Sequence, residues 1–160
     1  MSIYYHKFEV RWNDLDANRH LANSSYSQYC AQTRMAFMTK HKMGLKELNR
    51  WGIGPVILHE SFSFFKEIYM NQEVIVSLEI GGFSEDGAIY QFLPKFYLPD
   101  GTHCATSQMI GVWIDTMLRK ATTPPDDIVE VINQFKTPDT KVLTREDIKN
   151  LPFKPQDITF

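Results

Sequence analysis

The sequence has little of what marks a secreted, disulfide-stabilised or membrane-inserted protein. Only two of its 160 residues are cysteines, Cys30 and Cys104, and they form no Cys-x-x-Cys motif. A disulfide framework is therefore not expected, whereas a reducing compartment is. No apolar run approaches the length of a membrane span, and the first ten residues lack the basic and apolar regions of a signal peptide. We expect a cytoplasmic protein that does not insert into a membrane.

The sequence also lacks an excess of either charge and the common signatures of cofactor sites. Its formal net charge is −2, which gives no general attraction to nucleic acid. It contains no glycine-rich phosphate-binding loop and no Gly-x-Ser-x-Gly elbow. The five histidines are scattered, without the spacing of a metal site: His6, His20, His41, His59 and His103. We predict no metal, no cofactor and no nucleic-acid partner.

The chain does contain alternating strand patterns and one long helical pattern, within a length that fits one domain. Apolar and polar residues alternate over residues 4–12, which predicts a strand. After a polar loop, apolar positions recur at helical spacing over residues 24–42, and Gly44 is a natural stop. A short helical segment is expected over residues 45–51.

Strand patterns dominate the second half of the chain. They predict a four-stranded antiparallel meander over residues 55–69, 74–80, 90–98 and 102–118. In the first of these strands Val56 and Phe62 are expected on one face, and Gly81 with Gly82 is expected to end the second. One long helix covered by one curved antiparallel sheet gives the fold class α+β.

The domain is expected to span residues 1–135, with a helix opening near Pro124. Residues 136–160 are then a C-terminal extension packed on the domain surface. The extension contains a short helical pattern over residues 144–151.

Three motifs carry a resemblance to a known family. Asp14-Leu15-Asp16 follows the first strand, with Tyr26 ten residues later; Asp16, Asn18 and His20 form Asp-x-Asn-x-His, with Asn23 downstream; and Phe64-Phe65-Lys66-Glu67 lies in a later strand. In this strand–loop–helix order the chain resembles the hot-dog superfamily, in which a sheet wraps a central helix. The most similar branch is that of the 4-hydroxybenzoyl-CoA thioesterase-like and acyl-acyl-carrier-protein thioesterase-like proteins.

The resemblance implies hydrolysis of an acyl-CoA or acyl-carrier-protein thioester. Its catalytic residues would be Asp16, Asn18, His20 and Glu67. Because an aspartate is ionised at neutral pH, Asp16 could attack the thioester carbonyl directly or act as a general base on water. Asn18 could orient water or substrate, and His20 could transfer protons or brace the loop. Glu67 could belong to the site or be a surface charge, whereas Asp14 is expected to be a structural acceptor.

The start of the long helix supplies the rest of the predicted site. Its first N–H groups have no partner within the helix, so they can stabilise the oxyanion of a thioester under attack. The candidates are the amides near Asn23, Ser24 and Ser25. Asn23 could equally be the N-cap, and Ser25 with Gln28 could form a capping box. Tyr26 is expected to line the substrate site.

Departures from the family pattern keep a second function open. Plant members carry two hot-dog repeats where this chain has one, so a homodimer or homotetramer would have to supply the second. Ala22 replaces one of the asparagines that usually follow the histidine, and Arg19 replaces a common glycine. These two residues motivate an alternative, a non-catalytic module that binds acyl thioesters or lipids. A hydratase on the same fold would need a histidine–acid arrangement that we do not find.

Overall fold

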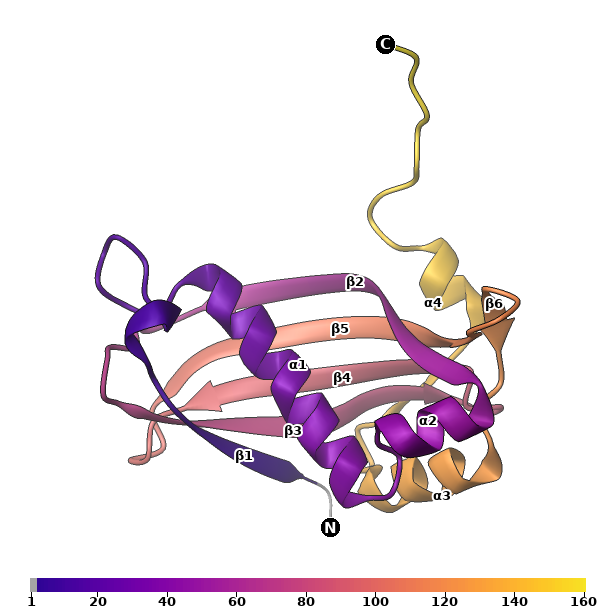
Figure 1. Cartoon of the computed structure of the whole chain (residues 1–160), viewed down its shortest axis with the longest axis horizontal. Coiled ribbons are helices and arrows are strands. Elements are labelled where there is room, and N and C mark those ends of the chain that lie inside the picture. The colour runs from indigo at the N-terminus through magenta and orange to yellow at the C-terminus, as the bar shows by residue number, and fades with distance from the viewer. Residues whose placement is uncertain (1–2) are drawn as a thin grey trace.

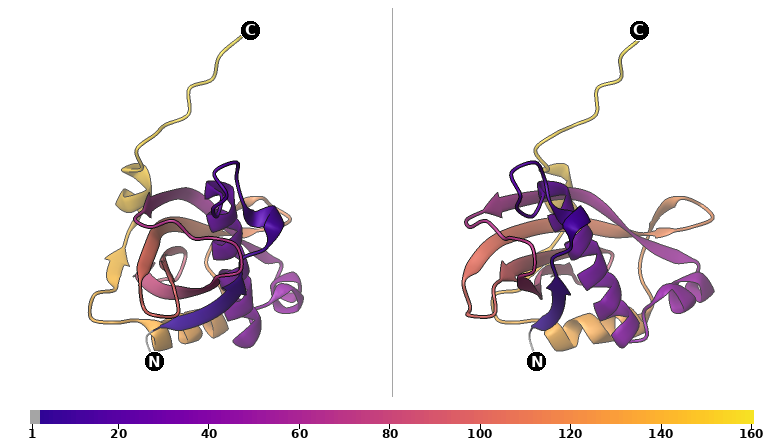
Figure 2. Two further views of the ribbon diagram at one scale, coloured as in Figure 1. Left: turned by 90° about the vertical axis from the view of Figure 1, so that its left-hand side faces the viewer. Right: turned by 60° about the vertical axis from the view of Figure 1, so that its left-hand side comes forward.

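The long helix α1 (Asn23–Lys40) lies across the concave face of a curved sheet (Figure 1). The computed structural model describes residues 3–160, and Figure 2 shows the sheet end-on, bending around the helix. Five strands form the body of the sheet, in the order β1 (Tyr4–Glu9), β3 (Glu73–Ser84), β4 (Ile89–Tyr97), β5 (His103–Asp115) and β2 (Ile53–Phe64). The α+β class and the sheet wrapped around one helix are confirmed.

The predicted four-stranded meander is wrong in its first strand. β3, β4 and β5 do form an antiparallel meander, but β2 pairs with β5 at the far edge of the sheet instead of with β3. The chain reaches this edge through α1 and the short helix α2 (Leu45–Trp51), whose position agrees with the prediction. Alternation of apolar residues identifies a strand, but it carries no information on which strands pair.

A β-bulge in β2 corrects the prediction for its two faces. The pairing with β5 shifts between Ile57 and His59, so one extra residue interrupts the alternation. Because a one-residue shift exchanges the two faces of a strand, Val56 and Phe62 point to opposite sides. Phe62 and Glu60 pair with the buried Ser107 and Met109 of β5, which places them on the face toward α1.

The Gly81-Gly82 pair does not end β3, as the sequence suggested. The strand continues to Ser84 through a bulge between Ile80 and Gly82. A Cβ at Gly81 would come within 2.7 Å of the Leu93 side chain, and one at Gly82 within 2.7 Å of the Leu143 side chain. The two glycines therefore permit close packing on both sides of the strand rather than a turn.

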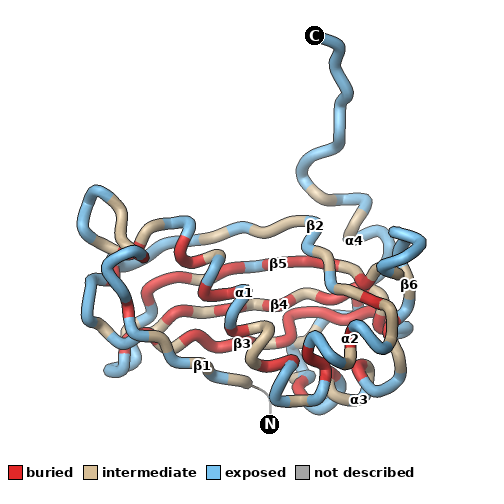
Figure 3. Tube along the Cα trace, in the orientation of Figure 1, coloured by how far each residue is buried: buried red, intermediate tan, exposed pale blue. Residues whose placement is uncertain are grey.

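The C-terminal part adds a helix that packs against β3 and a strand that pairs with β3. The remaining elements are β6 (Lys120–Thr122), α3 (Asp126–Phe135), β7 (Lys141–Leu143) and α4 (Arg145–Lys149). β7 pairs in parallel with β3 and buries Leu143, a strand that the sequence analysis missed. Residues 152–160 are exposed and run away from the domain (Figure 3), and the boundary at residue 135 stays a prediction.

The largest cluster of buried side chains lies between α1, α3 and the sheet, and it includes Phe37, Phe83, Ile128 and Phe135. A second cluster surrounds the N-terminal half of α1. Within the described part of the chain, no helix combines the length and apolarity needed to cross a membrane.

Gly111, in the middle of β5, provides a test of the packing beneath α1. It pairs with Tyr90 on one side and Ile57 on the other. The Tyr90 hydroxyl reaches over it to donate a 3.2 Å hydrogen bond to the carbonyl of Val56. A Cβ at Gly111 would overlap both of these oxygen atoms. We expect Gly111→Ala to lower the free energy of unfolding by about 1–3 kcal/mol in urea denaturation.

The matched control is Gly54→Ala in the neighbouring strand, where the added Cβ meets only a side-chain carbon at 3.6 Å. This substitution should change the free energy of unfolding by less than about 0.5 kcal/mol. Equal effects of the two substitutions would contradict the packing described here.

Candidate active site

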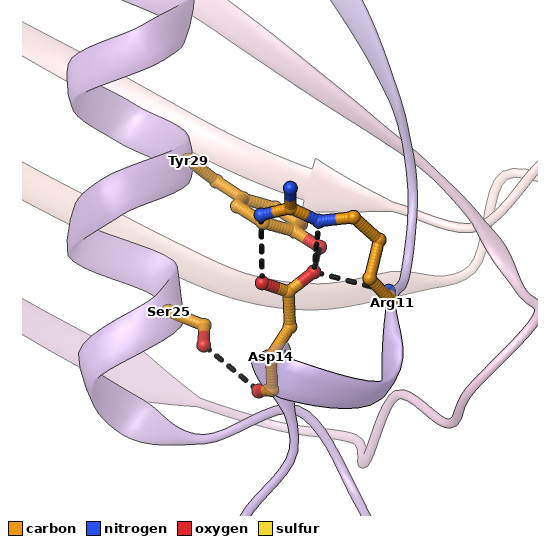
Figure 4. A network of polar contacts seen from close by, with 4 residues as sticks. All are labelled: Arg11, Asp14, Ser25 and Tyr29. Carbon is orange, nitrogen blue, oxygen red and sulfur yellow. Dashed lines mark hydrogen bonds and ion pairs between the residues drawn. The ribbon is translucent and has the colours of Figure 1, made fainter.

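A buried carboxylate holds the loop before α1 against that helix. Asp14, at the end of a short 3₁₀ turn (Trp12–Asp14), is only 2% exposed. Its carboxylate accepts hydrogen bonds from the Arg11 backbone and side chain at 3.0–3.3 Å and from the Tyr29 hydroxyl at 2.7 Å (Figure 4). Burial alone would raise the pKa of this carboxyl, but the bonds from Arg11 and Tyr29 outweigh it and hold the pKa below its usual range. The expected structural role of Asp14 is confirmed.

The backbone of Asp14 adds further contacts to those of its side chain, and together we call them the Asp14 anchor. Its carbonyl accepts the N–H of Ala22 at 2.9 Å and the hydroxyl of Ser25 at 2.8 Å (Figure 4). The Ser25 side chain is therefore turned away from solvent and does not form the capping box considered above. Ala22, rather than Asn23, is the N-cap residue, and it makes no side-chain cap.

Asp16 lies at the start of a tight turn that orients its carboxylate. Its Oδ1 accepts the Asn18 N–H at 2.8 Å, and its backbone N–H donates to the His20 carbonyl at 3.0 Å. Arg19 closes the turn with a φ of 67°, a conformation that favours glycine. This geometry suits the glycine that the resemblance implies at this position. The Asn18 side chain is exposed and lies outside the lining of the pocket described next.

The turn brings Asp16, His20 and Glu67 together although Glu67 is far away in sequence. Leu21 donates its N–H to the Ile68 carbonyl at 2.7 Å, and His20 forms a β-bridge with Tyr69. This short ladder places His20 between the two carboxylates. Its Nδ1 lies 3.6 Å from Asp16 Oδ2, and its Nε2 lies 3.8 Å from Glu67 Oε1.

These three side chains line a pocket of about 380 Å³ at the N-terminus of α1. The other lining residues come from the loop before α1, from α1 and from the segment that ends β2: Leu21, Asn23, Tyr26, Phe64, Phe65 and Lys66. Tyr26 packs against Phe64 with ring centroids 4.9 Å apart. Burial raises the pKa of Tyr26 to about 12, so its hydroxyl stays protonated and the ring forms a wall.

The first turn of α1 carries unpaired backbone donors, and one of them belongs to Asn23, which lines this pocket. Within residues 3–160, the N–H groups of Asn23 and Ser24 meet no hydrogen-bond acceptor. The N–H of Ser25 instead donates to the Ala22 carbonyl at 2.9 Å. Ser25 is therefore wrong as a candidate oxyanion donor, because neither its amide nor its hydroxyl is free. The Ser24 side chain is exposed and lies outside the lining, so only its amide remains a candidate.

Sequence analysis missed two features at the rim. Lys66 brings a cation to the pocket, and the Tyr69 hydroxyl donates a hydrogen bond to Glu67 Oε2. Both depend on how residues 65–69 leave β2, and no periodic pattern indicates that path. Within the described residues, no group of three or more histidine, cysteine or acidic side chains is placed to hold a metal ion. Burial raises the pKa of the Cys30 thiol to about 12, so it stays protonated.

The sequence family follows from a comparison with known proteins. Residues 10–132 match the family model of the thioesterase-like superfamily. The chain belongs to this superfamily. Membership identifies this thioesterase-like chain as a thioester hydrolase, and the matched region contains every residue of the pocket. No curated protein matches the chain significantly.

Solved structures share the fold of this thioesterase-like chain at low sequence identity. A 1,4-dihydroxy-2-naphthoyl-CoA thioesterase from Synechocystis superposes with a TM-score of 0.75 and 16% identity, covering 86% of this chain and 100% of that one. A Staphylococcus aureus protein solved in complex with CoA gives 0.78 and 18%, with 96% of each chain covered. A protein named oleoyl thioesterase from Lactobacillus plantarum gives 0.78 and 12%, covering 99% of this chain but 57% of that one.

The Asp14 anchor predicts how stability depends on pH. Asp14→Asn should lower the free energy of unfolding at pH 7 by about 2 kcal/mol, because hydrogen bonds to a charged acceptor are lost. A carboxyl whose pKa is lowered by folding stabilises the fold above its unfolded pKa, and this contribution disappears as the pH falls through the folded pKa. The difference between wild type and variant in urea unfolding should therefore shrink from about pH 5 to about pH 2.

The control is Asp139→Asn, in an exposed loop where the carboxylate accepts no hydrogen bond from the described residues. It should leave stability unchanged over the same range. A difference between wild type and Asp14→Asn that stays constant with pH would contradict the proposed charge of Asp14.

Proposed function

We propose that this thioesterase-like chain hydrolyses an acyl-CoA thioester in the pocket between Asp16 and the start of α1. One observation carries the proposal: the Asp16 carboxylate and Asn23, whose backbone N–H is unpaired, line the same pocket, and the unpaired N–H of Ser24 follows directly in the chain. These are the two components that attack on a thioester carbonyl requires, a nucleophile or base and donors for the oxyanion.

In the proposed reaction the thioester carbonyl oxygen is bound by the amides of Asn23 and Ser24. Asp16 then attacks the carbonyl carbon, which expels the thiolate and leaves a mixed anhydride for water to open. In the alternative route, Asp16 takes a proton from a water molecule that attacks instead. Both routes use the same carboxylate, and its Asn18 contact orients it in both.

His20 acts as a positioning residue between the two acids. Its ring nitrogens face Asp16 and Glu67 at 3.6 and 3.8 Å, which are ion-pair distances for a protonated ring but too long for hydrogen bonds. Glu67, braced by Tyr69, keeps the ring oriented. Lys66 at the rim offers a cation to the phosphate groups of the thiol carrier. Coenzyme A and the phosphopantetheine arm of a carrier protein both provide phosphate, and we propose coenzyme A.

The free edge of β2 favours a second copy beside it. In the described part of the chain β2 pairs only with β5, and Ile57, Leu58 and Phe64 are exposed along it. An unpaired apolar edge is a template for pairing with another chain. A homodimer or homotetramer therefore stays our prediction.

Asp16→Asn should lower kcat/KM for acyl-CoA hydrolysis by at least about 100-fold, since the substitution removes the nucleophile or base. Free thiol release would be measured across acyl-CoA and acyl-carrier-protein substrates. Asp127→Asn on α3 is the control and should match wild type. Equal, slow release by wild type and Asp16→Asn across the panel would refute the proposal. Tight acyl-CoA binding without turnover would favour the non-catalytic module.

The backbone donors can be tested at Asn23, the first residue of α1. Proline is tolerated at this position of a helix and removes the N–H. The preceding Ala22 has a ψ of 146°, as a residue before proline requires. Asn23→Pro should lower kcat by about 100- to 1,000-fold. Asn23→Ala loses the side chain and keeps the N–H, so its kcat should stay far higher. Equal kcat values for the two variants would rule out the amide as an oxyanion donor.

A further inference from the structure

One stripe of α1 connects the active-site pocket with a second cavity. Asn23, Ser27, Ala31 and Met35 are spaced four residues apart, so they lie on one face of the helix. Asn23 lines the active-site pocket, whereas Ala31 and Met35 line a separate cavity of about 140 Å³. Ser27 lies between the two.

The inward face of β2 runs along the same path. Phe64 lines the active-site pocket, and Ile57 lines the second cavity. Between them this face carries Phe62 and Glu60, because the bulge after Ile57 sets the register. Glu60 on the strand is therefore the counterpart of Ser27 on the helix.

These two residues meet across the path. The Ser27 hydroxyl donates a 3.2 Å hydrogen bond to Glu60 Oε2, while Glu60 Oε1 is enclosed without a hydrogen-bond partner among the described residues. An enclosed carboxylate oxygen without a partner costs stability. The Glu60 carboxylate therefore adds little to the stability of the fold. Its position between the two cavities indicates a role in the function of the site instead.

We propose that the Ser27–Glu60 contact is a gate that restricts the enzyme to short acyl groups. This inference rests on the proposed thioesterase function. Ser27 lies about 6 Å along the helix axis from Asn23, and Ala31 about 12 Å. An acyl group of a few carbons ends before the contact, whereas a longer chain has to displace the Glu60 carboxylate to reach the second cavity.

The second cavity is suited to the methylene groups that the gate excludes. Its lining is mostly apolar and includes Met38, Phe92 and Trp113. With the gate closed, this volume is separated from the reacting end of the substrate. Removal of the Glu60 side chain joins the two spaces and lengthens the acyl site without touching Asp16 or the helix N-terminus.

The test is the chain-length profile of hydrolysis from butyryl- to palmitoyl-CoA. Wild type should prefer butyryl- over dodecanoyl-CoA. In Glu60→Ala the ratio of kcat/KM for dodecanoyl-CoA to that for butyryl-CoA should rise at least about 10-fold, the order of discrimination expected of an apolar pocket. Glu60→Gln keeps the size of the side chain and an acceptor for Ser27, so its ratio should stay at the wild-type value.

Two further variants separate the gate from a general loosening of the site. Ser61→Ala, on the outward face of β2, should leave the profile unchanged. Adding Ala31→Phe to Glu60→Ala fills the second cavity and should restore the short-chain preference. A wild type that already prefers dodecanoyl-CoA, or a profile unchanged by Glu60→Ala in a variant that melts cooperatively, would overturn the gate.

A binding measurement distinguishes failure of the gate from failure of the thioesterase function. S-dodecyl-CoA, a thioether that cannot be hydrolysed, is titrated calorimetrically against wild type and Glu60→Ala. The variant should bind it about 10-fold more tightly, even if neither protein hydrolyses any thioester. Equal affinities would reject the gate, whereas tighter binding without any turnover would reject only the thioesterase function.

Discussion

The site depends on one buried carboxylate, that of Asp14. Its side chain fixes Arg11 and Tyr29, and its carbonyl fixes Ala22 and Ser25. These contacts join the end of the first strand to the first two turns of α1. The loop between them can then turn sharply and still present a carboxylate to the helix N-terminus. Because the buried Asp14 holds the loop in place, the neighbouring Asp16 is not needed for this role, and its carboxylate can line the pocket.

Much of this arrangement could be predicted from the sequence because it is local. Asp14, Asp16, His20 and Tyr26 lie within thirteen residues of one another, and a strand, loop and helix in succession bring them close together. The positive φ of Arg19 is also a local feature, because it belongs to the tight turn that starts at Asp16. The anchoring role of Asp14 follows from the same short segment.

Most of the errors concern contacts between distant segments. The pairing of β2 with β5, the added strand β7 and the bulge after Ile57 depend on tertiary packing, which alternation of apolar residues does not encode. The place of Glu67 beside His20 depends on the bridge between His20 and Tyr69. Ser25 was misjudged for a different reason: a hydroxyl at a helix start can serve the preceding loop instead of the helix.

The bulge in β2 would let this strand lose one residue in evolution without a change of register. Leu58 is the extra residue between the pairs Ile57–Gly111 and His59–Ile110, so loss of its codon would restore regular alternation and leave both halves of the strand paired as they are now. The residues that β2 turns toward α1 would then stay in place, and the backbone ladder would become continuous. A one-codon deletion here is therefore expected to preserve the substrate range, whereas the same deletion in a strand without a bulge would exchange the two faces of that strand.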